Sequence, residues 1–247
     1  MNAEIFALVT FGLLIVAIFA GMQVAEEGLS KSTKDTVKLA TNLVATMSAL
    51  VLGLLVSSAK NSYDTVRSEV IDVSSKVVFL DRLLAGYGPE AADARARVRE
   101  WTGEAINRMW PTEAGRAADL TPNSEGAKTV YLTIQNLPAK DDIQRAVKAE
   151  ATGVMIEIGK IRSLLVAQSV PSISKLMLAV LISWLVIIFF SFSMLAPTNA
   201  PAVTALVVSA LSTCGALSLI LELDQPFGGL IGISSQPMRN ALAQLVK

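Results

Sequence analysis

Four long stretches of the chain carry no charged residue, and every Asp, Glu, Lys and Arg lies outside them. They cover residues 5–25, 39–59, 176–195 and 202–221. A helix that crosses the roughly 30 Å of hydrocarbon in a bilayer needs about 20 mostly apolar residues, because each residue adds about 1.5 Å. We therefore predict an all-α polytopic protein with four transmembrane helices in a lipid bilayer.

The turn between the last two predicted spans is short. Residues 196–201 read Ala-Pro-Thr-Asn-Ala-Pro and carry no charge. Proline cannot continue a helix interior, so this segment predicts a tight turn between two antiparallel helices. The spans are thus expected in a two-plus-two arrangement, with one pair in residues 1–59 and the other in residues 175–221.

The first apolar stretch is interpreted as a span and not as a cleaved signal peptide. Signal peptides begin with a positively charged segment that is followed by about 7–15 apolar residues. Here the chain begins Met-Asn-Ala-Glu, without Lys or Arg, and the apolar stretch that follows is longer. The same stretch is therefore expected to remain as the first transmembrane helix.

Residues 60–174, between the two pairs of spans, show the periodicity of amphipathic helices. Apolar residues recur there every three or four positions in two stripes. The first stripe consists of Tyr63, Val66, Val70, Val73, Val77, Leu80 and Leu84, and the second of Ile143, Val147, Val154, Ile158, Ile161 and Leu165. This spacing is typical of helices that bury one face. We expect the stripes to form the core of a helical bundle, or in part a contact between subunits.

Glycine and proline divide this segment into helices. Nothing interrupts the second span at residue 60, so its helix is expected to continue to the Gly-Tyr-Gly-Pro sequence at residues 86–89. There Gly88 is suited to cap one helix and Pro89 to begin the next, which we expect to end at Trp110. Beyond it we expect a loop over residues 112–126 and a short helix over residues 128–135. A long helix is expected from Asp141 onward.

Lys and Arg near the span ends predict which side of the membrane each segment occupies. Four spans place both termini and residues 60–174 on one side. That side carries eight such residues, namely Lys60, Arg67, Lys76, Lys160, Arg162, Lys175, Arg239 and Lys247, and the other side carries Lys31, Lys34 and Lys38. Because cytoplasmic segments hold the excess of positive residues, we predict that the termini, residues 60–174 and residues 222–247 are cytoplasmic.

Composition restricts the classes of function. Lys and Arg number 21, as do Asp and Glu, so the net charge is zero and no basic excess points to a nucleic-acid partner. The chain has no histidine, the commonest metal ligand and a frequent general base. Its one cysteine, Cys214, excludes a disulfide within the chain. An enzyme is therefore the least favoured class, and composition indicates no cofactor.

Two carboxylates stand directly after the fourth span, at Glu222 and Asp224. In a homo-oligomer they would repeat around the axis as acidic rings, which favour cations by focusing negative potential. Their oxygen atoms are also of the type that Ca²⁺ takes as ligands. The alternative is a polar helix end whose carboxylates pair with Lys60, Lys175 or Arg239. Residues two positions apart do not share a helix face, so the helix is expected to end here.

One face of the second span is small and polar. We call it the small stripe; it consists of Asn42, Thr46, Ala49, Gly53 and Ser57, at steps of three or four residues. Such a face can line an ion pathway. It is also typical of close helix packing, because small residues let backbones approach and hydroxyls bond across the interface. The sequence leaves both interpretations open.

Two stretches carry a resemblance to a known family. The first reads Leu-Asp-Arg-Leu-Leu-Ala-Gly-Tyr-Gly-Pro-Glu over residues 80–90 and is followed by Arg95, Arg99 and Trp110-Pro111; the second reads Glu-Leu-Asp-Gln-Pro-Phe-Gly-Gly-Leu-Ile-Gly-Ile-Ser over residues 222–234. With four spans, they resemble the bestrophin-like domain family of bacterial and plant membrane proteins over nearly the whole chain. Structural roles are expected in these stretches for Gly88, Pro89, Pro226, Phe227 and Gly229.

The resemblance implies kinship with bestrophins, which are pentameric ion channels with anion-selective and cation-selective members. The resemblance therefore implies a homo-oligomer that conducts inorganic ions, with a pentamer as the first expectation. It also implies a location in the bacterial inner membrane. Glu222 and Asp224, which we call the acidic pair, favour cations. Residues 60–174 would form a cytoplasmic helical vestibule. No acidic cluster is as long as the calcium clasp of animal bestrophins, so calcium gating is not implied, although Ca²⁺ at the acidic pair stays open.

A non-conducting membrane scaffold or sensor, whose cytoplasmic helical domain binds a partner, is the alternative to the channel. It would use the same helices, with the small stripe buried in contacts between copies. A small-molecule transporter is less favoured, because the spans contain no charged residue and no inverted repeat is evident. Oligomeric symmetry with an open central path would separate the channel from the scaffold.

Overall fold

The computed structural model describes residues 3–25, 30–111, 118–121, 124–168, 173–228 and 231–245. Over these ranges the chain forms α-helices joined by short turns, with one 3-10 turn and no β-strand. The prediction of an all-α protein is therefore confirmed. The chain divides into two units, one of Met1–Ser62 with Pro171–Asp224 and the other of Tyr63–Val170 with Gln225–Lys247.

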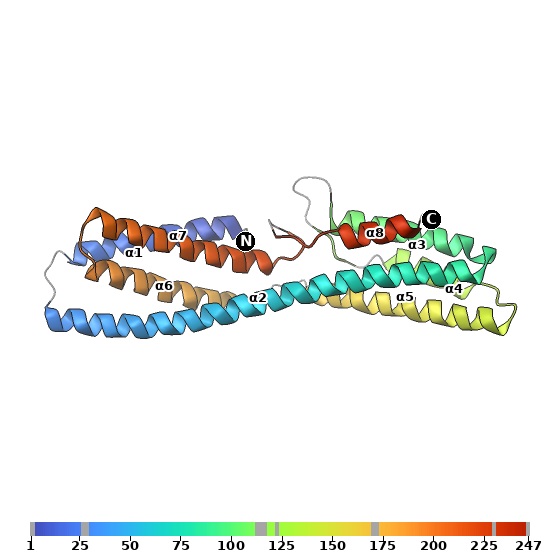
Figure 1. Cartoon of the computed structure of the whole chain (residues 1–247), viewed down its shortest axis with the longest axis horizontal. Coiled ribbons are helices and arrows are strands. Elements are labelled where there is room, and N and C mark those ends of the chain that lie inside the picture. Colours follow the sequence, from blue (N-terminus) through green and yellow to red (C-terminus); the bar gives the residue numbers. More distant parts are fainter. Residues whose placement is uncertain are drawn as a thin grey trace. The chain divides into compact units, whose positions relative to one another are not determined.

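The first unit holds the apolar helices (Figure 1). They are α1 (Ala3–Ala25), the first part of α2 (Lys31–Tyr87), α6 (Lys175–Leu195) and α7 (Ala200–Leu223). In the described part of the chain these four helices are long and apolar enough to cross a membrane. α1 packs against both α6 and α7.

The turn between α6 and α7 is short, as its two prolines predict. Asn199 caps α7, because its side-chain oxygen accepts a hydrogen bond of 3.0 Å from the N–H of Ala202. Pro201 lies in the first turn of α7, where the missing N–H of proline removes no helical hydrogen bond. The predicted span ends near residues 59, 175 and 221 stay predictions.

α2 is a single helix of 57 residues that belongs to both units. This confirms that the helix of the second span continues without a break through residue 60. Most of the stability of such a helix comes from the packing of its apolar stripe and not from intrinsic helix propensity. It ends at Tyr87, directly before Gly88.

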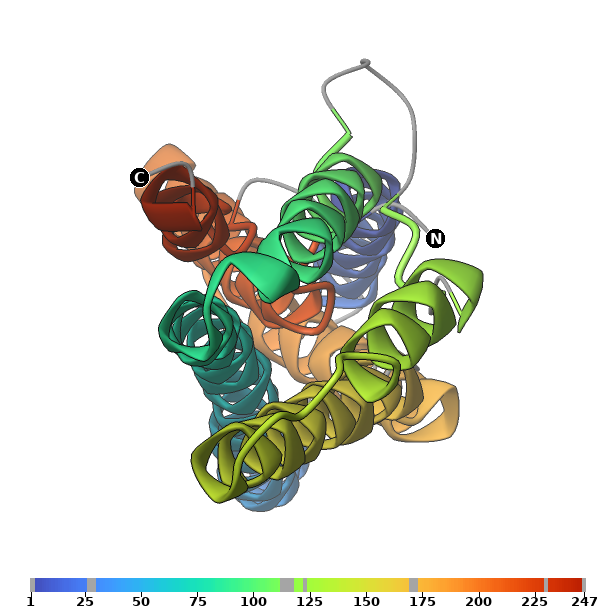
Figure 2. The same cartoon turned by 90° about the vertical axis from the view of Figure 1, so that its right-hand side faces the viewer.

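The second unit is a helical bundle built on the second part of α2. Along the chain it adds η1 (Pro89–Ala91), α3 (Ala92–Met109), α4 (Ser124–Gln135), α5 (Asp142–Gln168) and α8 (Gln236–Leu245). Figure 2 shows these helices nearly end-on. α4 packs on both α3 and α5, and α8 packs on α3.

The two predicted stripes supply much of the core of this bundle. On α2 the buried residues are Val66, Val70, Val73, Val77, Leu80 and Leu84, and on α5 they include Val154, Ile158 and Leu165. Side chains also link the two helices, since Lys76 Nζ lies 2.6 Å from Glu157 Oε2. Ile143 departs from the prediction: it lies in the first turn of α5 and is 76% exposed.

Two elements differ from the sequence prediction. α4 begins at Ser124, within the region predicted as a loop. Ser and Glu are favoured at the start of a helix, and here Ser124 and Glu125 outweigh the unfavourable helix propensity of Gly126. α8 was not predicted, although Met238, Ala241 and Leu245 are buried on one side of it. The sequence also predicts that Pro171 breaks the helix before the third span, because proline disfavours helix at the residue before it, and this position lies outside the described residues.

Candidate functional site

The small stripe lies on the surface of the chain. Asn42, Thr46, Ala49, Gly53 and Ser57 are all exposed on α2. A Cβ atom added to Gly53 would meet nothing within 4 Å, so no neighbouring element packs closely there among the described residues. The hydroxyl of Thr46 donates to the carbonyl oxygen of Asn42 in its own helix, at 2.9 Å. If the small stripe packs on a helix, no described part of this chain supplies that helix at Gly53.

α2 presents three different faces in the first unit. Its buried face consists of Thr41, Ser48, Leu55 and Ala59. With 3.6 residues per turn, the small stripe lies roughly 120° around the helix from that face. A third face, which we call the leucine face, exposes Leu43, Met47, Leu50 and Leu54. The leucine face suits lipid or an apolar partner, whereas the small stripe offers oxygen atoms and little bulk.

Glu222 and Asp224 lie at the end of α7, where the sequence predicted that this helix stops. The helix ends at Leu223, and Asp224 is its C-terminal cap, with its N–H donating to the carbonyl oxygen of Ile220 at 3.1 Å. Both acidic residues are half-buried, on either side of the buried Leu223. The side chain of Lys175, one of the proposed partners, lies outside the described residues.

A complete metal site is not formed by these carboxylates within one chain. The described ranges contain no group of three or more Asp, Glu, Cys or His residues that could hold a metal ion. Ca²⁺ takes about six to eight oxygen ligands, more than Glu222 and Asp224 provide together. A calcium ion at this position would need further oxygen ligands, from other carboxylates, carbonyl groups or water.

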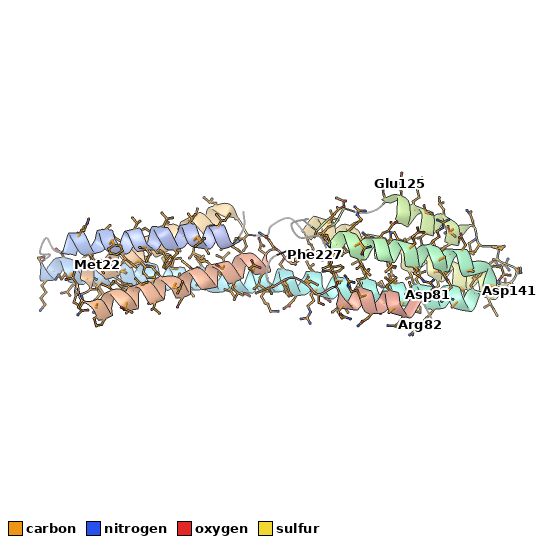
Figure 3. All side chains as sticks on the ribbon, turned by 90° about the horizontal axis from the view of Figure 1, so that it is seen from above. Met22, Asp81, Arg82, Glu125, Asp141 and Phe227 are labelled. Carbon is orange, nitrogen blue, oxygen red and sulfur yellow. The ribbon has the colours of Figure 1, made fainter. Side chains whose placement is uncertain are left out.

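The segment after α7 forms a loop that is attached to the end of α3. The N–H of Ile233 donates to the carbonyl oxygen of Pro226 at 2.7 Å, which closes the loop. The ring of Phe227, labelled in Figure 3, lies edge-on to the indole of Trp110 at a centroid distance of 5.8 Å. The indole N–H of Trp110 donates to the carbonyl oxygen of Ile233 at 2.7 Å. Pro226 and Phe227 thus hold this connection, and Gly229 lies outside the described residues.

Gly88 and Pro89 form the turn from α2 into η1. Gly88 has φ of 120°, a left-handed conformation that residues with a Cβ avoid, and a Cβ there would lie 2.9 Å from Glu90 Oε2. The adjacent Tyr87 hydroxyl donates to the carbonyl oxygen of Pro138 at 2.9 Å. Burial raises the pKa of Tyr87, so it stays a protonated donor. These bonds attach the end of α2 to the segment before α5.

A nearly buried ion pair joins α2 to α3. Arg95 donates from Nε and Nη2 to the two carboxylate oxygens of Asp81, both at 2.8 Å. The Asp81 side chain is 8% exposed, and its hydrogen bonds raise the pKa of Arg95. The next residue, Arg82, is exposed instead and lies beside α8 (Figure 3).

Arg162 on α5 is a buried arginine of the second unit, and its position was missed in the sequence. It is 9% exposed, with its guanidinium carbon 5.2 Å from the ring centroid of Trp101. Burial lowers the pKa of Arg162, and the positive charge of Arg108 lowers it further. The sequence carried a signal, because Arg162 stands four residues after Ile158 and three before Leu165, on the buried stripe of α5.

The comparisons with known proteins agree with this architecture. A family model described as the Bestrophin-like domain matches residues 6–238. Two mutant forms of a bacterial Bestrophin homolog from Klebsiella pneumoniae have similar solved structures. One has a TM-score of 0.71 at 12% identity, covering 97% of this chain and 96% of that chain. The other has a TM-score of 0.69 at 15% identity, covering 100% and 98%. A search of the curated proteins gives no match.

Proposed function

Because the chain belongs to the Bestrophin-like domain family, we propose that it is an oligomeric ion channel that favours cations. The family and the apolar helices make it an integral membrane protein. Bestrophins, to which the sequence motifs show kinship, are ion channels. The fold is shared with a bacterial Bestrophin homolog over almost the whole of both chains. We assign no enzymatic reaction to it.

The exposed small stripe on α2 carries this proposal. A side-chain amide such as that of Asn42 is costly to expose to hydrocarbon, where nothing can bond to it. In a symmetric homo-oligomer, with a pentamer as the first choice, each copy would turn its small stripe toward the common axis. The oxygen atoms of Asn42, Thr46 and Ser57 would then line a path for hydrated ions. The leucine face would meet lipid or the neighbouring copy.

The acidic pair supports the preference for cations. Glu222 and Asp224 would repeat around the axis as rings of negative charge at the end of α7. A unit charge about 4 Å from an ion contributes about 1 kcal/mol in water and about 4 kcal/mol at an effective dielectric near 20. Several copies together are therefore enough to select for cations. The same rings would offer Ca²⁺ a shared site.

The proposed topology places both termini and the second unit in the cytoplasm. In this topology the four helices form two pairs of spans. The second unit, most of which lies between the two pairs in the sequence, forms a helical vestibule. The excess of Lys and Arg at the ends of the spans on that side supports this orientation in the bacterial inner membrane.

A non-conducting scaffold or sensor is the second candidate, and one observation favours it. A groove of about 500 Å³ runs between α2 and α8 in the second unit. Ile71 and Phe79, both exposed, lie in its lining together with Arg82. Apolar residues with a charged rim are typical of docking surfaces. A scaffold would bind a partner there and would not conduct.

The channel is tested by cysteine modification during flux in liposomes. Single cysteines are placed along the small stripe and, as matched controls on the same helix, along the leucine face, all in a Cys214→Ala background. A cationic water-soluble thiol reagent should reduce cation flux through the Thr46→Cys protein and leave the Leu50→Cys protein unaffected. A channel path along the small stripe predicts this difference, because only water-exposed thiols react.

Three results would contradict the proposal. One is the absence of flux for any inorganic ion through the parent protein, together with normal assembly, which favours the scaffold. The other is inhibition at the leucine face without inhibition at the small stripe. A monomeric mass in lipid nanodiscs would also exclude a path formed between copies.

A further inference from the structure

The groove between α2 and α8 exposes apolar side chains on the surface of the second unit. Ile71 and Phe79, which are 48% and 44% exposed, lie in its lining. Arg82 lies in the same lining, beside α8 (Figure 3), and forms no ion pair among the described residues. Exposed apolar patches with a charged rim are typical of contacts between proteins. The groove therefore suits a protein surface that is apolar and carries a negative charge.

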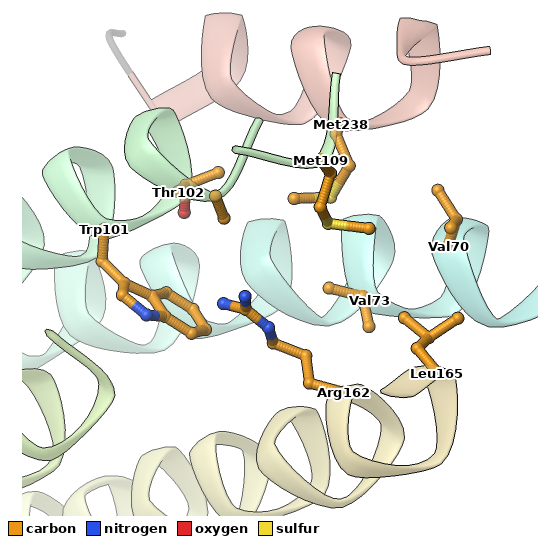
Figure 4. Close-up of a pocket in the computed structure, with 9 residues that line it drawn as sticks. Val70, Val73, Trp101, Thr102, Met109, Arg162, Leu165 and Met238 are labelled. Carbon is orange, nitrogen blue, oxygen red and sulfur yellow. The ribbon is translucent and has the colours of Figure 1, made fainter. Parts of the chain in front are cut away.

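α5 presents an outer face that carries little charge. Its inner face holds Arg162 and Leu165, which point toward the other helices of the bundle (Figure 4). On the opposite side Ile156 is 45% exposed, and a Cβ atom added to Gly153 would meet nothing within 4 Å. A helix that faces water usually carries charged and polar residues on this side. The outer face of α5 consists of the exposed residues Ala149, Gly153, Ile156, Lys160 and Ala167.

Two side-chain contacts fix the level of α5 beside α2. Lys76 Nζ lies 2.6 Å from Glu157 Oε2, and Gln168 Nε2 donates to Glu69 Oε1 at 2.9 Å. Residue numbers therefore rise along α5 where they fall along α2, so the two helices are antiparallel. Ile156, next to Glu157, stands at the level of the groove.

The charged residues of the two helices match at these levels. Arg82 and Asp72 are ten residues apart on α2, and Glu150 and Lys160 are ten residues apart on α5, which is about 15 Å in each helix. Because the helices are antiparallel, Glu150 stands near the level of Arg82, and Lys160 stands near that of Asp72. All four residues are exposed. The two surfaces are thus complementary in charge.

The complementary charges do not meet within one chain. Within the described residues, Arg82, Glu150 and Lys160 form no ion pair. With 3.6 residues per turn, Arg82 lies roughly 120° around α2 from Lys76, which contacts α5 of the same chain. The groove therefore faces away from that α5, and a second copy is needed to bring the matched charges together.

Other helices of the second unit fit the groove less well. α3 exposes no large apolar side chain. On α4, Leu132 is 45% exposed, but the one acidic residue of that helix is Glu125. Gln135, at the end of α4, donates to Thr152 at 3.1 Å and so stands near the level of Arg82. Glu125 is ten residues, or about 15 Å, away from that level.

We propose that the groove between α2 and α8 binds the outer face of α5 of a neighbouring copy of this chain. In a ring whose axis runs along the helices of the second unit, every copy stands at the same level. Ile156 of one copy then reaches Phe79 of the next, and Glu150 pairs with Arg82. Since the groove and the outer face are different surfaces, the contact is head-to-tail and closes into a ring. The inference rests on the homo-oligomer of the proposed function, and it does not depend on conduction.

Disulfide cross-linking of the full chain in membranes tests the contact. Phe79→Cys and Ile156→Cys are combined in a Cys214→Ala background and oxidised with copper–phenanthroline and oxygen. The combined variant should give a ladder of cross-linked species that ends at the closed ring. Each cysteine alone should give no cross-link, and the two single variants co-expressed should give dimers and nothing larger. Phe79→Cys combined with Leu132→Cys is the matched control and should give no ladder.

Charge reversal tests the ion pair across the same contact. Arg82→Glu and Glu150→Arg each bring like charges together, so each should weaken assembly by roughly fivefold in the dissociation constant measured by mass photometry in detergent. The double variant restores opposite charges and should recover most of this loss. Arg97→Glu is the control on α3, where the Arg97 side chain is 48% exposed, and it should assemble as the parent does.

The outcomes separate this contact from the channel. The contact is overturned if the parent is oligomeric and the Phe79 and Ile156 cysteines give no ladder, or if the double charge reversal recovers nothing. Flux through a protein without the ladder would keep the channel and exclude the contact. Cross-linked rings that pass no ion in liposomes would keep the contact and exclude the channel.

Discussion

Gly21 of α1 lies so close to Ser193 of α6 that a Cβ atom at Gly21 would overlap the Ser193 hydroxyl and the carbonyl oxygen of Phe190. Ser193 is fully buried, and its hydroxyl donates to that carbonyl oxygen at 2.9 Å. Small residues at such points let membrane helices approach closely. Gly21 therefore determines how α1 packs on α6.

We predict that Gly21→Ala destabilises the first unit by about 1–3 kcal/mol, because the added methyl group must displace backbone atoms of α6. The measurement is the apparent Tm in detergent together with the elution profile in size exclusion. Gly12→Ala is the control on the same helix, since a Cβ at Gly12 meets nothing within 4 Å. Equal Tm values for the two variants would contradict the packing described here.

The ion pair between Asp81 and Arg95 gives a second prediction. Arg95→Met leaves the carboxylate of Asp81 nearly buried and without its two charged hydrogen bonds. The loss should be on the order of 3 kcal/mol, at the low end for buried pairs because the Arg95 side chain is 29% exposed. Thermal unfolding in detergent, followed by tryptophan fluorescence, measures it.

The double variant Asp81→Leu with Arg95→Met should recover part of that loss, since apolar replacement removes both unpaired charges. Arg97→Met serves as the surface control and should change Tm little. If the single and double variants are equally unstable, the loss arises from packing and not from the unpaired carboxylate.

The acidic pair gives the third prediction. We expect Glu222→Gln and Asp224→Asn each to lower the cation-to-anion permeability ratio in liposomes, because several negative charges leave a confined space at once. The effect should shrink at high salt, which screens exposed charges over about 10 Å at 0.1 M. Assembly is followed in parallel by size exclusion.

Asp93→Asn is the matched control for these variants, since the Asp93 side chain is 70% exposed on α3. It should leave the permeability ratio unchanged. Should both variants at the end of α7 assemble normally and keep the ratio of the parent at low salt, the acidic residues are structural. Loss of assembly with unchanged selectivity would support the alternative of a polar helix end.

Orientation is the fourth prediction. Single cysteines at Ser30 and Ser124, both exposed, are compared in a Cys214→Ala background. A membrane-impermeant thiol reagent applied to intact cells should label the cysteine at position 30, because that side of the membrane has the fewer Lys and Arg residues. Labelling at position 124 without labelling at position 30 would reverse the orientation.

Much of the architecture was accessible from local pattern. Residues 31–85 contain no proline and a single glycine, Gly53. A lone glycine is tolerated within a helix, so the sequence favours one long helix here, as observed in α2. The core residues Val66, Val73 and Leu80 follow from their spacing. α8 was missed because a stretch of ten residues shows few periods, and its burial depends on α3, which is distant in the sequence.

The sequence by itself determined the helical class, the apolar helices and the family, because these depend on composition, periodicity and short motifs. The tertiary structure alone decided which faces of the apolar helices are covered within the chain and which side chains meet across elements. It showed that no described residue lies close to Gly53 of the small stripe, that Phe227 contacts Trp110, and that Arg162 is buried beside Trp101. The physical reason is that exposure and charge balance depend on atoms brought together from distant segments, and no local pattern encodes those distances.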